Sequence, residues 1–77
     1  MERLVEIFAR ALVEDEGAVR VSRVDHGDAV VIEVDVSPED RGRLIGRRGQ
    51  TISALRTIVD AVAERRGEGP CELEIVE

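Results

Sequence analysis

Aromatic side chains are nearly absent from this sequence. Among its 77 residues Phe8 is the one aromatic residue, and neither tryptophan nor tyrosine occurs. RRM, cold-shock and OB-fold domains hold nucleic acid by stacking its bases on several aromatic side chains. A chain with one phenylalanine lacks such a platform, so the composition argues against these modules.

Lysine does not occur, and cysteine and histidine occur once each. A Walker phosphate loop contains Gly-Lys-Ser/Thr, and the run Gly49-Gln50-Thr51 lacks the lysine. Cys71 alone can form neither an internal disulfide nor a zinc cage. We expect Cys71 to lie in the core and His26 in a solvated turn. With no nucleophile–base pair or metal-ligand cluster visible, the sequence predicts a protein that is not an enzyme and holds no cofactor or metal.

Long hydrophobic runs are missing too. No apolar segment approaches the roughly 18 residues of a membrane span, and the N-terminus lacks the basic flank and apolar stretch of a secretory signal. We therefore expect a cytoplasmic protein with one small domain over residues 1–77. Its core should be thin, because a domain of this size removes only about 60% of its unfolded surface from water.

Hydrophobic spacing predicts a helix and then two strands in the first half of the chain. The helix covers residues 2–14, and its apolar face carries Leu4, Ile7, Phe8, Ala11 and Leu12. Residues 19–24 and 29–36 alternate as strands around a turn at residues 25–28. Val24 breaks the first alternation, which indicates a β-bulge.

The second half of the chain predicts two helices and a last strand. Ser37-Pro38-Glu39-Asp40 is typical of a helix start, with a capping hydroxyl and a proline at the first helical position. This short helix is interrupted at Gly46, a longer helix runs from Gln50 to Arg66, and residues 71–76 form a strand. The order is α-β-β-α-α-β, an α+β fold. Acidic side chains on the outer face of the strands indicate that the helices cover the other face only.

The net charge of −6 conceals one basic segment. Residues 41–56 contain five arginines and no acid, while six arginines and seventeen acids give the rest of the chain a charge of −11. The five are Arg41, Arg43, Arg47, Arg48 and Arg56. On charge alone, a solvated helix face explains them equally well. A nucleic acid, if bound, should approach along the turn between the two later helices, away from the acidic sheet face.

Gly46-Arg47-Arg48-Gly49 lies at the centre of the basic segment. Two glycines three residues apart let the backbone turn sharply and leave main-chain N–H groups open to a phosphate. The turn also precedes the longer helix, whose N-terminal dipole favours an anion. As a bare pattern this spacing is common between helices. It gains weight because helices flank it, Leu44-Ile45 precedes it and Ile52 follows it.

In this setting the run from Pro38 to Ile58 resembles the KH domain in its type II arrangement, and in particular the small single-domain bacterial proteins of the KhpA family. The resemblance extends over essentially the whole chain. It implies a three-stranded mixed sheet with three helices on one face. It also implies an RNA-binding protein whose glycine loop clamps the backbone of about four nucleotides, with the bases in an aliphatic groove.

The resemblance also implies roles for single residues. The two glycines would shape the loop, and the two arginines between them would contact phosphates. Ile45, Ile52 and Val34 would floor or support the groove, or lie in the core as plain hydrophobic residues. The expected RNA-binding set is Arg41, Arg43, Ile45, Gly46, Arg47, Arg48, Gly49, Gln50 and Ile52.

The longer helix carries a second apolar pattern. One face, expected to pack on the sheet, holds Ile52, Leu55, Val59 and Val62, and a separate stripe holds Ala54, Ile58 and Ala61. The stripe is either part of a broad core face or a dimer interface anchored by Ile58.

The resemblance favours association, since it implies a homodimer or a pair with a larger KH-R3H protein of the KhpB/Jag type. It further implies post-transcriptional regulation or RNA chaperoning. The alternative is a protein-interaction module in which nucleic-acid binding is vestigial.

Overall fold

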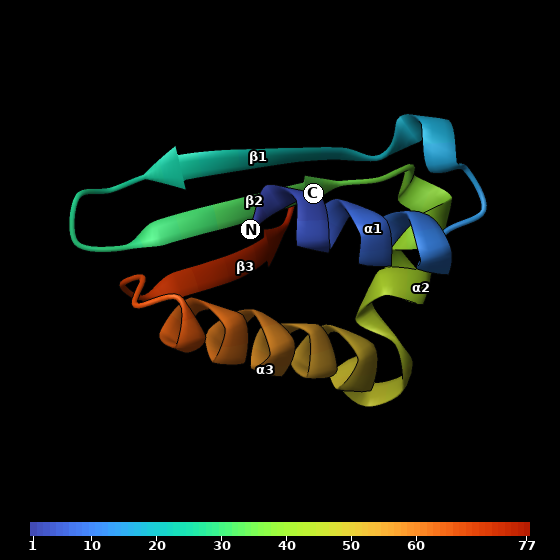
Figure 1. Cartoon of the computed structure of the whole chain (residues 1–77). Helices are drawn as coiled ribbons and strands as arrows, with labels where there is room; N and C mark the ends of the chain where they lie inside the picture. The colour runs from blue at the N-terminus through green and yellow to red at the C-terminus, as the bar shows by residue number, and fades with distance from the viewer.

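The elements follow one another in the predicted order α-β-β-α-α-β (Figure 1). The computed structural model describes residues 1–77. Its helices and strands are α1 (Glu2–Leu12), β1 (Arg20–Asp25), β2 (Val30–Asp35), α2 (Arg41–Ile45), α3 (Gln50–Arg65) and β3 (Cys71–Ile75), with 3₁₀ turns at Glu16–Ala18, Pro38–Asp40 and Arg47–Gly49. None of the helices has the length and hydropathy of a membrane span.

The three strands form one mixed sheet in the order β1-β2-β3. β1 runs antiparallel to β2 in a register that is unbroken over all six residues of each strand, so the predicted bulge at Val24 is wrong. Val24 instead pairs with Val31 on the open face of the sheet, where an apolar cross-strand pair is favourable. β3 lies parallel to β2 and forms the free edge beside α3 (Figure 1).

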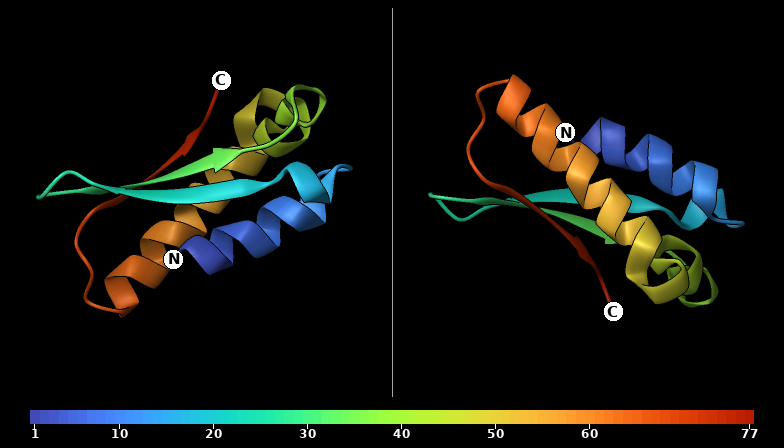
Figure 2. Two further views of the ribbon diagram at one scale, coloured as in Figure 1. Left: turned by 90° about the horizontal axis from the view of Figure 1, so that it is seen from above. Right: turned by 90° about the horizontal axis from the view of Figure 1, so that it is seen from below.

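The helices build the core on one face of the sheet, as predicted. Ile32 and Val34 of β2 and Leu73 of β3 share this core with side chains of all three helices. These are Val5, Ala9, Leu44, Ile52, Leu55 and Val59. α3 crosses the strands steeply and α1 runs closer to their direction (Figure 2), while α2 lies beyond the end of the sheet (Figure 1). The opposite face leaves acidic side chains in water, as at Glu72 and Glu74.

α1 is rotated relative to its predicted apolar face. Val5 and Ala9 are buried, whereas Ile7 is 55% exposed and Leu12 is 36% exposed, and Ala11 is exposed as well. The apolar side chains form one broad face opposite the charged residues of the helix, and hydrophobic spacing alone does not show which side of that face packs on the sheet. The helix also ends two residues earlier than predicted, because the residue after Leu12 is extended and packs in the core.

Asp40 is the one charged residue buried in the core. Its carboxylate accepts the backbone N–H groups of Glu14 (3.2 Å) and Asp15 (3.1 Å), and it pairs with Arg43 Nε of α2 at 3.1 Å. The Ser37 hydroxyl lies 3.1 Å from a carboxylate oxygen of Glu39 and 3.3 Å from one of Asp40, and it caps no backbone N–H, so the predicted cap is wrong. The N–H of Asp15, above all, holds the pKa of Asp40 below its usual value.

Asp40→Asn should lower the free energy of unfolding, because an amide presents a donor where the carboxylate accepts two backbone N–H groups. Since the pKa of Asp40 is depressed on folding, its contribution is complete above the unfolded pKa. It is lost as the pH falls from about 4 through the folded pKa. The gap in thermal midpoint between parent and variant, measured at neutral and acidic pH, should therefore narrow on acidification. Asp28→Asn, at an exposed aspartate of the turn between β1 and β2, is the control, and a gap that stays constant would contradict the assignment.

Candidate nucleic-acid interface

The loop between α2 and α3 has an unusual backbone. Gly46 adopts φ 76° and ψ 174°, a region essentially restricted to glycine. Arg48 (φ 56°) and Gly49 (φ 74°) are both left-handed. Arg48 is the one non-glycine residue of the chain with a positive φ, at a cost of about 1–2 kcal/mol. Backbone strain of this kind is concentrated at functional sites.

The two glycines of the loop meet different constraints. A Cβ at Gly46 would lie 2.6 Å from the Cβ of Thr51 and 2.9 Å from its backbone nitrogen. A Cβ at Gly49 would meet nothing within 4 Å. The first glycine is therefore required by both space and conformation, and the second by conformation alone. Because Gly46 has no side chain, Thr51 in the first turn of α3 can pack directly against the loop.

The loop places two arginines at the N-terminus of α3. No side chain caps this helix end, whose first N–H groups lack partners within the helix and carry the positive end of its dipole. Arg47 and Arg48 are exposed, and neither belongs to any ion pair of the structure. An anion set against the loop therefore meets two free guanidinium groups and a helix end.

The other arginines of the basic segment are engaged or half-buried. Arg43 pairs with two carboxylates, at 3.1 and 3.5 Å. Arg41 is half-buried, and its Nε atom has no hydrogen-bond partner. Arg56 donates its Nε and Nη2 to the carbonyl oxygen of Leu73, at 3.3 and 3.2 Å. Within this segment the loop arginines alone are both exposed and unpaired.

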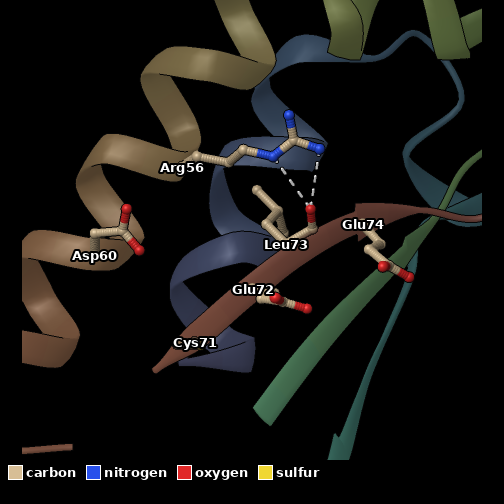
Figure 3. A pocket seen from close by; sticks show the side chains of 6 residues that line it. All are labelled: Arg56, Asp60, Cys71, Glu72, Leu73 and Glu74. Carbon is tan, nitrogen blue, oxygen red and sulfur yellow. Dashed lines mark hydrogen bonds between the residues drawn. The ribbon is translucent and has the colours of Figure 1, made fainter. Parts of the chain in front are cut away.

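A groove leads from the loop along α3 and β3. Its first hollow, of about 270 Å³, begins at Ile45 and Ile52 and reaches Arg56 and Glu74. The second, of about 350 Å³, shares Arg56 and Glu74 and extends to Asp60 (Figure 3). The third, of about 200 Å³, continues from Asp60 to the segment before β3. We call the three hollows together the α3–β3 groove.

The free edge of β3 forms one wall of the groove. The N–H of Val76 and the carbonyl of Pro70 are bonded to β2, so the even-numbered residues of β3 turn their backbone groups into the sheet. The N–H and C=O groups of the alternate residues, Cys71, Leu73 and Ile75, therefore face the groove. Arg56 reaches across from α3 to the middle carbonyl of this edge (Figure 3).

The structure gathers many of the residues expected from the sequence at one end of the groove. Ile45 and Ile52 line it beside the loop, and the exposed Gln50 opens α3. Arg43 is held by carboxylates. Val34 is 1% exposed within the core and lines no part of the groove.

Sequence reasoning missed the acidic wall of the groove. The carboxylates of Asp60, Glu64 and Glu68 border it from α3 and the segment before β3, and Glu77 lies at its other end. Glu72 and Glu74 border it only across the edge of β3, because their side chains lie on the open face of the sheet, as the alternation predicted. The alternation of residues 71–76 identifies a strand but not its place at the edge beside α3. Cys71, predicted in the core, is half-buried and lines the groove, and burial raises the pKa of its thiol.

The α3 stripe (Ala54, Ile58 and Ala61) is exposed, with Ile58 at 36%. The buried face of α3 consists of Ile52, Leu55, Val59 and Ala63. Val62, predicted for this face, is half-buried. The stripe therefore lies outside the core of a single chain.

The order of elements, the mixed sheet and the glycine-bounded loop between two helices together define a type II KH domain. The family model described as KhpA/KhpB, KH domain, matches residues 2–75, and the chain belongs to this family.

Named relatives cover most of the chain. It is 46% identical over 66 residues to the RNA-binding protein KhpA of Halalkalibacterium halodurans, which spans 86% of this chain and 87% of that protein. Identity is 38% over 77 residues with the RNA-binding protein KhpA of Aquifex aeolicus, with coverage of 100% and 96%. Identity with the RNA-binding protein KhpA of Streptomyces coelicolor is 37% over 65 residues, which cover 84% of this chain and 82% of that protein. These relatives are named as RNA-binding proteins, not as enzymes. No solved structure gives a significant match.

Gly46→Ala should lower the free energy of unfolding more than Gly49→Ala. A left-handed alanine at position 49 costs about 1–2 kcal/mol, whereas a methyl group at position 46 also collides with Thr51. Urea unfolding followed by circular dichroism measures both. Adding Thr51→Ala should not rescue Gly46→Ala, because the backbone nitrogen stays 2.9 Å from the added methyl group. Equal losses in the two glycine variants would refute the close contact.

Proposed function

We propose that this protein binds short segments of single-stranded RNA through the Gly46–Gly49 loop and the α3–β3 groove. The observation that carries the proposal is the pair of free arginines at an uncapped helix end that opens directly onto a groove. Membership of the KhpA/KhpB family and relatives named RNA-binding protein KhpA support it.

The charges of the site fix how a strand would lie in it. Phosphates bind at the loop, where Arg47, Arg48 and the helix dipole attract them. The acidic wall of the groove repels phosphates, so the bases and not the backbone face β3. Only a single strand can separate its bases from its phosphates in this way, and KH loops hold about four nucleotides. Ile45 and Ile52 supply the aliphatic surface for the first base.

We further propose that the protein works as an assembly. A single short site binds weakly, and joining two such sites raises affinity through effective concentration. The α3 stripe offers an exposed apolar face for a homodimer or for a KhpB/Jag-type KH-R3H partner. Post-transcriptional regulation or RNA chaperoning in the cytoplasm fits weak binding of this kind. The same exposed stripe favours the second candidate, a pairing module in which RNA binding is vestigial.

Arg47→Asp combined with Arg48→Asp should abolish RNA binding and leave the fold intact, since both side chains are exposed and unpaired. Fluorescence anisotropy with short single-stranded RNA measures the affinity. The matched control, Arg65→Asp with Arg66→Asp, makes the same charge change at the far end of α3 and should have a smaller effect. Unchanged affinity in the loop variant would leave the pairing module as the better account.

The salt dependence of the parent protein provides a check on the same contacts. With about two or three phosphates neutralised, log K should fall against log salt with a slope of roughly −1.4 to −2.1. A slope near zero would rule out the arginine loop as the phosphate site.

Ile58→Asp should convert the protein to a monomer, because it places a charge at the centre of the α3 stripe. Light scattering over a range of concentrations reads the oligomeric state. Ser53→Asp adds the same charge to an exposed position elsewhere around the helix and should leave the dimer intact. A parent protein that is already monomeric at high concentration would remove the stripe as an interface.

A further inference from the structure

Three apolar side chains that the core does not bury share one flank of α1. They are spaced three and four residues apart, which places them on one side of the helix, and we call them the α1 patch: Leu4, Ile7 and Ala11. Ile7 is 55% exposed, more than any other large hydrophobic side chain of the chain. The helix packs into the core through Val5 and Ala9 instead, so the patch is left to the surface.

The α1 patch faces the same side of the molecule as the α3 stripe. The two helices lie side by side on one face of the sheet (Figure 2). Glu2, on the opposite flank of α1, reaches Arg23 of β1 at 3.9 Å, so the patch is turned away from β1 and towards α3. Arg56, on the opposite flank of α3 from the stripe, reaches β3, so the stripe is turned towards α1. Patch and stripe therefore form one apolar surface over the helical layer.

The two helices add no free carboxylate to this surface. α1 has two acids, Glu2 and Glu6, and both are in ion pairs with arginines, at 3.9 and 3.1 Å. The two acids of α3, Asp60 and Glu64, line the groove on the other flank of the helix. Two copies of a chain with a net charge of −6 repel each other over most of their surface. Across this surface they can approach without bringing free carboxylates of the helices together.

The α3 stripe alone is too small for a stable dimer. A specific interface covers about 800 Å² on each partner, which is about a sixth of the 5092 Å² of accessible surface of this chain. Two of the three residues of the stripe are alanines, and Ile58 is 36% exposed, so the stripe supplies only a fraction of this area. The α1 patch adds a second large side chain, Ile7, and extends the apolar surface across both helices.

We infer that a second copy of this chain binds over the α1 patch and the α3 stripe together, with Ile7 as an anchor beside Ile58. Because both copies use the same surface, the contact is two-fold symmetric and closes as a dimer. The inference rests on the proposed assembly, and goes beyond it by naming the partner and by making α1 part of the interface. The α3–β3 groove lies on the other flank of α3, so both grooves of the dimer stay open.

Ile7→Asp tests the α1 patch. The dissociation constant of the dimer, measured by analytical ultracentrifugation, should rise about thirtyfold or more, as for the loss of a central anchor of an interface. The matched control is Ile45→Asp, the same substitution at an isoleucine as exposed as Ile58 but placed in the groove. This control should leave the dimer intact. Circular dichroism checks that both variants fold.

Methyl NMR of the parent protein provides a second measurement, which does not depend on the folding of any variant. As the protein is diluted, the methyl signals of Ile7 and Ile58 should shift with one common midpoint, because the same contact buries both. The signal of Ile45 should stay in place.

An Ile7 variant that dimerises like the parent would overturn the inference and leave the α3 stripe as the interface. An Ile7 methyl signal that does not follow that of Ile58 would do the same, as would an Ile45 variant that dissociates equally. A parent protein that stays monomeric would overturn both the inference and the proposed homodimer, and would leave the surface to a different partner.

RNA binding is tested apart from dimerisation. The affinity of Ile7→Asp for a single-stranded RNA of about four nucleotides should match that of the parent, because the variant leaves the loop and the groove intact. A large loss would place the α1 patch in the RNA site and overturn the inference. If the parent binds no RNA but dissociates on Ile7→Asp, the inference stands and the proposed RNA binding fails.

Discussion

Asp40 holds one negative charge inside the core and joins three stretches of the chain through it. Its carboxylate accepts two backbone N–H groups just after α1 and pairs with Arg43 of α2. It also lies 3.3 Å from the Ser37 hydroxyl, which precedes α2 in the chain. α2 has only five residues, too few to be stable by itself, and buries one of them, Leu44. The position of this short helix, and of the glycine loop that follows it, therefore depends on a buried anion whose lost hydration is replaced by protein donors.

The distribution of charge, more than its total, defines the candidate site. A chain with a net charge of −6 places two free arginines at one helix end and borders the adjoining groove mainly with carboxylates. In the binding mode that we propose, phosphates meet the loop and bases lie along β3. The acidic remainder also limits non-specific attachment to polyanions, because most of the surface repels them.

The sequence correctly predicted the features that depend on neighbouring residues, such as strands and turns. Its predictions were wrong or incomplete for features that depend on contacts between distant parts of the chain. Alternating valines identify β2, and Gly46 and Gly49 identify the loop, because strand faces and left-handed turns are local properties. The orientation of α1 was wrong because its apolar face is broad, and spacing alone does not show which side of that face packs on the sheet. The Ser37 cap was wrong because carboxylates compete for its hydroxyl. The acidic groove wall went unseen since it exists only once β3 pairs parallel to β2 and becomes the edge beside α3.

The bond from Arg56 to Leu73 has a consequence for the protein in isolation. An unpaired strand at a sheet edge is a template on which another chain can add a strand, the first step of aggregation. Here the central carbonyl of that edge is already occupied by Arg56, and Glu72 and Glu74 place charges beside it. These two features of the edge disfavour the addition of a strand from a neighbouring chain, while the backbone groups of Cys71 and Ile75 remain unpaired.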